Sequence, residues 1–340
     1  MVKTKSKIII IFSFIFFVCL FGCAGFFFLE ISSFMKTPFN PLAKEKLFTV
    51  KPGQSLKSIA KNLEKEAVIS SQTYFIVFTK FKKADKKLQA GEYSLSGSKS
   101  PEQILEIFLT GKVKLHRITI PEGLNIREVA ALVETADFCT QSKFMALCRD
   151  KTFIRSIGIK STTLEGYLFP DTYFFPNAAS CEDIITTMVE HFKTVFTEKW
   201  QTRAKTMGFC VHDIVTLASI IEKETGDASE RPLISSVFHN RLKKNMRLQS
   251  DPTVIYGIKN FDGNIKRKHL KTVTPYNTYQ IKGLPLGPIA NPGALSLQAA
   301  LYPAQTEYLF FVSKKDTTHQ FSKTIQAHNQ AVKKYQLRKK

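Results

Sequence analysis

The first patterned stretch of the chain is an apolar run near its N-terminus. Residues 8–29 contain no charged side chain, and three lysines precede them. An apolar run of this length can cross a bilayer as one helix, and basic flanking residues favour the cytoplasmic side. The bulky residues at 26–28 argue against cleavage as a signal peptide. We therefore predict a cytoplasmic tail at 1–7, an uncleaved transmembrane anchor at 8–29, and the rest of the chain outside the cytoplasm.

Residues 30–46 contain prolines, serines and scattered charges, a composition typical of a linker. Beyond them, one pattern of polar and apolar positions occurs twice. Residues 48–64 read as a strand, a Pro-Gly turn and an amphipathic helix, and residues 118–134 repeat this pattern without a gap. The alignment continues into a second helix, where Tyr74-Phe75 meet Phe144-Met145.

A second strand and a third helix then follow in each copy. The sequence therefore predicts two copies of a strand–helix–helix–strand–helix unit, at 47–113 and 114–190. The later copy carries an insertion at 153–170 that is rich in aromatic residues, and extra sequence in one copy of a duplicate is a reasonable place for function. Chance similarity between two short α/β stretches is the alternative explanation.

The C-terminal half is predicted to be mostly helical, which makes the whole chain α+β. A polar, aromatic and Pro/Gly-rich run at 275–293 interrupts the helices, and such a long irregular stretch inside a compact domain is usually functional or disordered. The expected elements are helices at 182–207, 211–224, 229–242 and 251–257, a hairpin at 308–321, and a final helix.

Glu222 is the candidate acid of the 211–224 helix. It lies seven residues after Val215 and four after Ala218, so it continues the apolar stripe of that helix. Burial raises the pKa of a carboxyl, and a carboxyl that keeps its proton near neutral pH can act as a general acid. We expect an uncharged Glu222 beside an apolar surface. The alternative is a structural glutamate held by an arginine or a backbone N–H.

Composition narrows the choice of partner and of chemistry. The formal net charge is +21, which is compatible with nucleic acid, an anionic polymer or a membrane surface. An extracytoplasmic body and the lack of a nucleic-acid recognition motif argue against nucleic acid. The histidines are scattered and no CxxC pair occurs, so no metal or other cofactor is expected. Cys139, Cys148, Cys181 and Cys210 allow one or two disulfides, and their spacing does not choose the pairing.

Several long motifs resemble one family. They are LASIIEKET at 217–225, MRLQSDPTVIYG at 246–257, YNTY at 276–279, GLPLGPIANPG at 283–293 and EGYLFPDTY at 165–173. In this order they resemble the membrane-bound endolytic murein transglycosylases, over nearly the whole chain outside the anchor and linker. The resemblance implies a LysM-like module at 47–113, followed by a catalytic domain at 114–336 that contains the second LysM-like copy.

The resemblance also implies an activity and its site. Members of this family cleave the β-1,4 bond between N-acetylmuramic acid and N-acetylglucosamine in peptidoglycan strands and leave a 1,6-anhydro end. The family's catalytic glutamate maps onto Glu222, and Glu224 is its rival for the acid role. Candidate substrate-binding residues are Glu165, Tyr167, Tyr173, Ser219, Glu224, Asn240, Gln249, Asp251, Tyr276, Asn277 and Thr278.

The expected setting follows from the anchor and the family together. The protein is predicted to be single-pass in the inner membrane, with a periplasmic catalytic domain, glycan strands as its substrate, and peptidoglycan synthases as candidate protein partners. Two other functions fit the same sequence: a non-catalytic scaffold that binds the cell wall, and a muramidase that uses water and leaves reducing ends.

Overall fold

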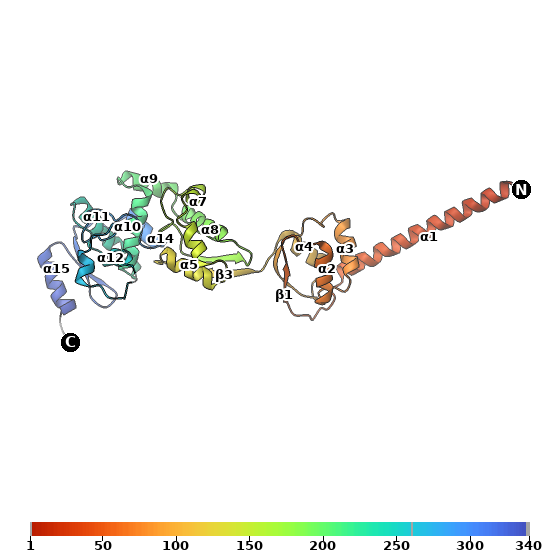
Figure 1. The fold of residues 1–340 in the computed structure, drawn as a ribbon, viewed down its shortest axis with the longest axis horizontal. Coiled ribbons are helices and arrows are strands. Elements are labelled where there is room, and N and C mark those ends of the chain that lie inside the picture. The colour runs from red at the N-terminus through yellow and green to blue at the C-terminus, as the bar shows by residue number, and fades with distance from the viewer. Residues whose placement is uncertain (1, 260, 338–340) are drawn as a thin grey trace. The chain divides into compact units, whose positions relative to one another are not determined.

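The computed structural model describes residues 2–259 and 261–337, with side chains from residue 14 onwards. It is a mixed α+β structure in two compact units (Figure 1). The first unit contains the chain up to residue 116 together with 176–178, and the second contains the remainder. Each unit has its own hydrophobic core.

The first unit begins with the long helix α1 (Val2–Lys36), and residues 14–36 of it are long and apolar enough to cross a membrane. The helix does not end at residue 29, so the linker expected at 30–46 begins only after Lys36. Ile31 and Met35 are buried in the core of the first unit, because four-residue spacing places them on one face of the helix. The end of α1 is therefore part of the folded module.

The rest of the first unit has the element order predicted for the repeat. Its elements are β1 (Lys46–Val50), α2 (Leu56–Lys65), α3 (Gln72–Phe81), β2 (Gly91–Leu95) and α4 (Pro101–Thr110). β1 and β2 pair antiparallel with Phe48 opposite Tyr93, and both rings point into the core. Ser55, Ser71 and Ser100 cap the three helices by accepting backbone N–H groups.

The second unit opens with the same order of elements. They are β3 (Leu115–Thr119), α5 (Ile126–Thr135), α6 (Gln141–Leu147), an additional α7 (Lys151–Ser156), β4 (Thr172–Pro176) and α8 (Cys181–Val195). The second helices of the two copies, α3 and α6, align one residue away from the expected match of Tyr74-Phe75 with Phe144-Met145. The caps are Ser71 and Thr140, so the buried Phe75 corresponds to the buried Phe144. The connection before α6 is one residue shorter than that before α3.

The remaining elements surround α10 (Val211–Glu224), whose residues 214–221 are all buried. The single helix expected at 182–207 is two helices, because Thr197 adopts an extended conformation and starts α9.

A disulfide joins Cys139 to Cys181, while Cys148 and Cys210 are free. The other elements are α9 (Glu198–Thr206), η1 (Ala228–Glu230), α11 (Arg231–Lys243), α12 (Asp251–Tyr256), α13 (Arg267–Lys271), α14 (Ala294–Leu301), β5 (Phe310–Ser313), β6 (His319–Ser322), α15 (Ile325–Val332) and η2 (Lys333–Leu337).

Candidate active site

Glu222 lies in the last turn of α10, and its side chain is only 6% exposed. Its Oε1 accepts a hydrogen bond from Arg231 Nη2 at 3.1 Å, and its Oε2 accepts one from the Gly293 N–H at 3.1 Å. The burial predicted from the helical pattern is present. The surroundings differ from the apolar surface expected, because an arginine and a backbone N–H, the partners of the structural alternative, hold Glu222.

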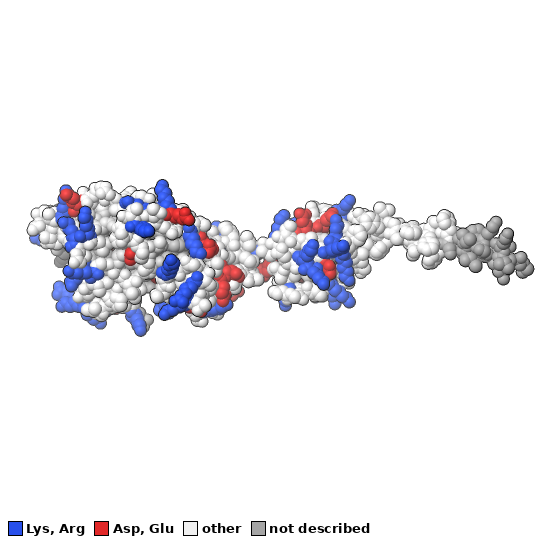
Figure 2. Space-filling model, turned by 90° about the horizontal axis from the view of Figure 1, so that it is seen from above, with Lys and Arg blue, Asp and Glu red and all other residues white. Residues whose placement is uncertain are grey.

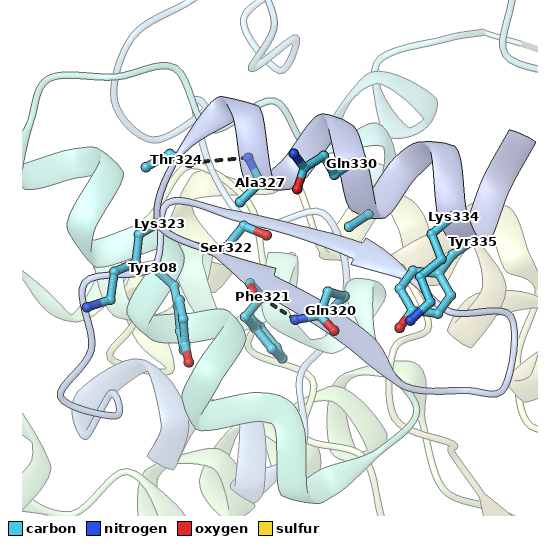
Figure 3. A pocket seen from close by; sticks show the side chains of 11 residues that line it. Tyr308, Gln320, Phe321, Ser322, Lys323, Thr324, Ala327, Gln330, Lys334 and Tyr335 are labelled. Atoms are coloured by element: carbon cyan, nitrogen blue, oxygen red, sulfur yellow. Dashed lines mark hydrogen bonds between the residues drawn. The ribbon is translucent and has the colours of Figure 1, made fainter.

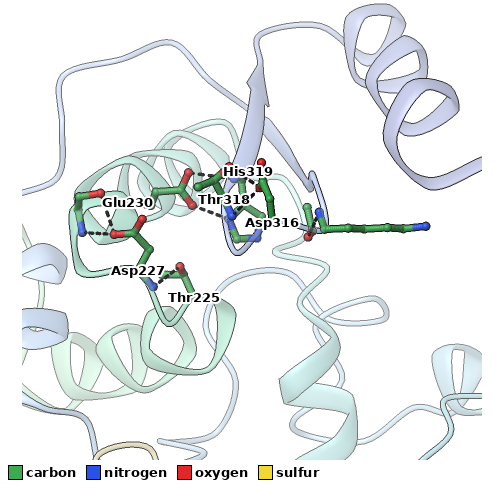
Figure 4. A network of polar contacts seen from close by, with 9 residues as sticks. Thr225, Asp227, Glu230, Asp316, Thr318 and His319 are labelled. Atoms are coloured by element: carbon green, nitrogen blue, oxygen red, sulfur yellow. Dashed lines mark hydrogen bonds and ion pairs between the residues drawn. The ribbon is translucent and has the colours of Figure 1, made fainter.

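Arg231 reaches Glu222 because the turn between α10 and α11 is fixed by its own polar contacts (Figure 4). Thr225 Oγ1 accepts the Asp227 N–H, and the Asp227 carboxylate accepts the Ser229 N–H. Glu230 then accepts the backbone N–H of His319 at 2.9 Å and lies 2.6 Å from its Nδ1. Strand β6 therefore holds the residue directly before Arg231 and fixes the start of α11.

Glu122 shares the same guanidinium. Arg231 Nη2 lies 3.3 Å from Glu122 Oε2, so a single nitrogen contacts two carboxylates. The Glu122 side chain is 44% exposed, whereas those of Arg231 and Glu222 are almost fully buried. Arg231 Nε is buried with no hydrogen-bond partner among the described residues. We call these three side chains the Glu122–Arg231–Glu222 cluster.

The loop that carries Glu122 is held against the helices of the site. Lys223 donates to the Gly123 carbonyl at 3.1 Å, and Asn291 accepts the Gly123 N–H at 2.9 Å. Gly123 has a φ of +79°, which glycine adopts without strain. A Cβ on Gly293 would lie 1.8 Å from Glu122 Oε1, so any larger residue there would make this half-exposed carboxylate move away from α14.

The cluster holds two negative charges against one positive charge. Burial raises the pKa of Glu122, and the nearby Glu222 carboxylate raises it further, while Arg231 opposes both effects. Gly293 is the N-cap of α14, and its N–H group favours negative charge at this position. Glu122 is therefore the member of the cluster whose environment favours the protonated carboxyl.

Two other glutamates have enclosed carboxyls. Burial raises the pKa of Glu224 to about 7, and Ser250 Oγ donates to its Oε1 at 2.5 Å. Burial also raises the pKa of Glu165 to about 7, and this carboxyl accepts the Ile126 N–H and the Tyr256 hydroxyl. Both glutamates therefore join elements of the fold: Glu224 joins α10 to the start of α12, and Glu165 joins α5 to α12.

Most of the other predicted binding residues are also engaged with the protein itself. Tyr167 and Tyr173 are buried, with their hydroxyls against His212 and the Phe169 carbonyl, so in this arrangement neither ring is open to a sugar. Ser219 is buried in α10 and accepts the Ile289 N–H, which fixes the 283–293 loop on that helix.

The residues around α12 form a second group. Asn277 and Thr278 are buried, and they bind the Thr272 carbonyl and the Ser250 N–H. The helix cap there is Ser250, so the exposed Asp251 is the first helical residue and accepts the Tyr279 hydroxyl. Asn240 donates to the carbonyls of Thr306 and Tyr308, and Gln249 accepts a hydrogen bond from Arg241. The Tyr276 ring packs against the Tyr256 ring.

Sequence reasoning missed Glu122, Arg231 and Gly293 as members of the site. A signal for Glu122 was present, because the alignment of the two repeats places it opposite Pro52, beside the glycines 53 and 123 that match. The later copy thus has a carboxylate where the earlier copy has a turn proline. No sequence spacing relates Arg231 or Gly293 to Glu222.

A groove of about 450 Å³ lies between the β5–β6 hairpin and α15 (Figure 3). Aromatic and polar side chains line it, including Tyr308, Gln320 and Tyr335. None of the residues predicted for the site lines this groove, so it is separate from the Glu122–Arg231–Glu222 cluster.

Comparison with known proteins identifies the family. The model of the YceG-like family matches residues 48–334. The chain belongs to the YceG-like family. A Bacillus subtilis relative, described as an endolytic murein transglycosylase, is 36% identical over 88% of this chain and 88% of its own length.

Two further relatives agree with this family. A Streptococcus pneumoniae protein described as an endolytic murein transglycosylase is 28% identical over 94% of this chain, which corresponds to 62% of its own length. The crystal structure of a putative YceG-like protein from Listeria monocytogenes superposes with a TM-score of 0.59 at 34% identity. That match covers 84% of this chain and 98% of the Listeria chain. The family's fold therefore extends over most of this chain.

Proposed function

We propose that this YceG-like protein is an endolytic murein transglycosylase, a lyase that cleaves the β-1,4 bond between N-acetylmuramic acid and N-acetylglucosamine within peptidoglycan strands. The observation that carries the proposal is the 36% identity to a transglycosylase along 88% of both chains. The site supports it with a buried carboxyl, Glu222, at the position of the family's catalytic glutamate.

Glu222 acts as acid and then as base. Its proton passes to the glycosidic oxygen while the bond from C1 to that oxygen breaks. The C6 hydroxyl of the muramic acid attacks C1, and its proton returns to Glu222. The product is a 1,6-anhydro end, and no water is consumed. A second carboxylate to activate water is therefore unnecessary, unlike in most glycoside hydrolases.

Glu222 is paired with Arg231, so a single isolated acid does not describe this site. The Glu122–Arg231–Glu222 cluster supplies the missing proton because its two carboxylates share one cation. Glu122 is the more exposed member, and it connects the cluster to solvent. Glu122, whose pKa is raised, takes up the proton from solvent, and Glu222 is the member that delivers it to the glycosidic oxygen.

We further propose the arrangement of the chain around this enzyme. Residues 1–7 are cytoplasmic, α1 anchors the protein in the inner membrane, and the catalytic domain at 114–336 is periplasmic. The repeats at 47–113 and 114–190 are LysM-like, and the element order that they share, apart from the additional α7 of the second copy, supports this. Anchoring keeps the site near the membrane, where new strands emerge, so peptidoglycan synthases are proposed partners. Cells with Glu222→Gln should then have longer glycan strands.

The test uses the full-length protein in detergent with purified sacculi. Mass spectrometry of the released fragments should detect 1,6-anhydro ends for the wild type and for a Glu198→Gln control, whose glutamate is exposed on α9. Glu222→Gln should release at least about a hundredfold less. Reducing ends would indicate a muramidase, and binding without release would indicate a scaffold. A fully active Glu222→Gln variant would refute the assignment of Glu222.

A further inference from the structure

The outer end of α1 packs against α3 of the module through aromatic pairs. The ring of Tyr74 lies 5.8 Å from that of Phe27 and 5.5 Å from that of Phe34, and Phe81 lies 6.0 Å from Phe28. All are edge-to-face contacts, an arrangement that aromatic pairs favour. Helix α3 therefore lies beside residues 27–34 of α1.

The length of α1 gives the depth of this contact in a bilayer. The apolar run at 8–29 spans roughly 33 Å as a helix, close to the ~30 Å of a hydrocarbon core. Phe28 therefore lies at the edge of the core, and the next turns of α1 rise through the headgroup layer. Since α3 contacts this part of α1, it lies at headgroup depth.

A groove of about 310 Å³ opens at the same place, between α1, α3 and the start of α4. Its apolar lining includes Phe28, Ile31 and Phe81, and its two cations are Lys36 and Lys82. Ser32 adds a hydroxyl, and Glu102 is the only acidic residue that lines it. Apolar walls beside two ammonium groups match the glycerol and phosphate end of a phospholipid.

The surface around the groove also combines exposed apolar side chains with lysines. Phe81 is 68% exposed and Val77 is 38% exposed, although both belong to a well-formed helix. Exposed lysines follow at 80, 82, 83, 86 and 87, with Asp85 among them. Figure 2 shows basic side chains, with a few acidic ones, gathered on the module near the apolar helix. Basic and aromatic residues together are typical of segments that bind anionic membrane surfaces.

We propose that the groove between α1 and α3 binds the phosphate of an anionic phospholipid, with Lys36 and Lys82 as its cationic contacts, and that this holds the module against the membrane surface. The inference rests on the membrane anchor proposed above.

Bromine-labelled lipids test this position in the full-length chain. Trp200 is the only tryptophan, so a Trp200→Phe background lets Phe81→Trp serve as a single reporter. Reconstituted in phosphatidylglycerol vesicles, this reporter should be quenched about twofold or more by lipids brominated near the headgroup. The matched control is Leu47→Trp on β1, which is 48% exposed and belongs to a strand of the same module; it should remain unquenched.

Replacing both Lys36 and Lys82 by Gln tests the role of the two cations. Quenching of the reporter should fall towards the value in purely zwitterionic vesicles. The headgroup site would be overturned if quenching were the same in phosphatidylglycerol and zwitterionic vesicles and were unaffected by the two substitutions. A chain that floats with vesicles but shows no quenching of the reporter would overturn this inference alone. A chain that does not float would refute the membrane anchor itself.

Discussion

The Nη2 nitrogen of Arg231 lies 3.1 Å from Oε1 of Glu222, so the glutamate expected to donate a proton is paired with a buried cation. The same nitrogen lies 3.3 Å from Glu122 Oε2. The charge of the site therefore depends on all three side chains. Substitutions at Glu122 and at Arg231 should move the pH dependence of activity in opposite directions.

Glu122→Gln removes one negative charge from the cluster. The amide cannot bind the proton that the raised pKa of Glu122 retains, so activity should be lost at lower pH on the alkaline side. The pH profile of fragment release, compared with that of Glu198→Gln, measures this shift. A profile identical to the wild type would show that Glu122 does not participate.

Arg231→Gln removes the only cation of the cluster. Two carboxylates then lie close together and hold a proton more tightly, so the alkaline limit of activity should move to higher pH. The variant should also lose about 3–5 kcal/mol of stability, since a buried charge loses its partner. Chemical denaturation and the pH profile measure the two effects. A shift to lower pH would contradict the shared-proton account.

Gly293→Ala tests the packing of the site. The new Cβ would lie 1.8 Å from Glu122 Oε1, so Glu122 must move away from α14. We expect an activity loss of at least about tenfold, because Glu122 is displaced from the cluster. Stability should change by no more than about 0.5 kcal/mol, because the half-exposed carboxyl of Glu122 can swing into solvent. Gly226→Ala is the control, because a Cβ there meets nothing within 4 Å. Equal activity of the two variants would show that the position of Glu122 beside α14 does not matter for activity.

The stability of the second unit should depend on Glu165 and Glu224. The pKa of each is raised to about 7, above the ~4.3 of an unfolded glutamate. The folded state thus binds more protons between these values. Its extra stability is present below about pH 4 and is lost as pH rises through 7, by about 3 kcal/mol per group.

Denaturation followed by Trp200 fluorescence should show this loss in the wild type. Glu165→Gln and Glu224→Gln should each flatten the pH dependence, because a neutral amide cannot ionise. Glu198→Gln, at an exposed position, should leave the slope unchanged. A slope that persists in both buried variants would show that other groups cause it.

The disulfide between Cys139 and Cys181 should stabilise the second unit by restricting its unfolded chain. The two cysteines are 42 residues apart, a separation that corresponds to about 3–4 kcal/mol. Replacing both by Ser should lower the free energy of unfolding by this amount. Cys210→Ser, at an exposed free cysteine, should have no such effect. Equal stability of the two variants would contradict this role.

The local sequence was enough to predict most helices and strands and their order along the chain. Asn125 and Glu128 form a capping box at the start of α5, and such a cap depends only on residues within one turn. The repeated order of elements and the burial of Glu222 followed from periodicity for the same reason. The one-residue shift in the second helices was missed because a shorter loop changes the alignment without changing the pattern.

Within the part of the chain that the structure describes, the sequence by itself determined an apolar N-terminal helix, a buried acid on α10 and the motifs that resemble one family. Only the tertiary structure decided that Arg231, Gly293 and Glu122 meet at that acid, and that α1 continues into the module. Helical periodicity shows which face of a helix is buried but carries no information about the residues packed against it. Arg231 arrives through the turn after α10. Glu122 and Gly293 come from distant segments, and long-range packing brings Glu122 to 3.3 Å from Arg231 and Gly293 to 3.1 Å from Glu222.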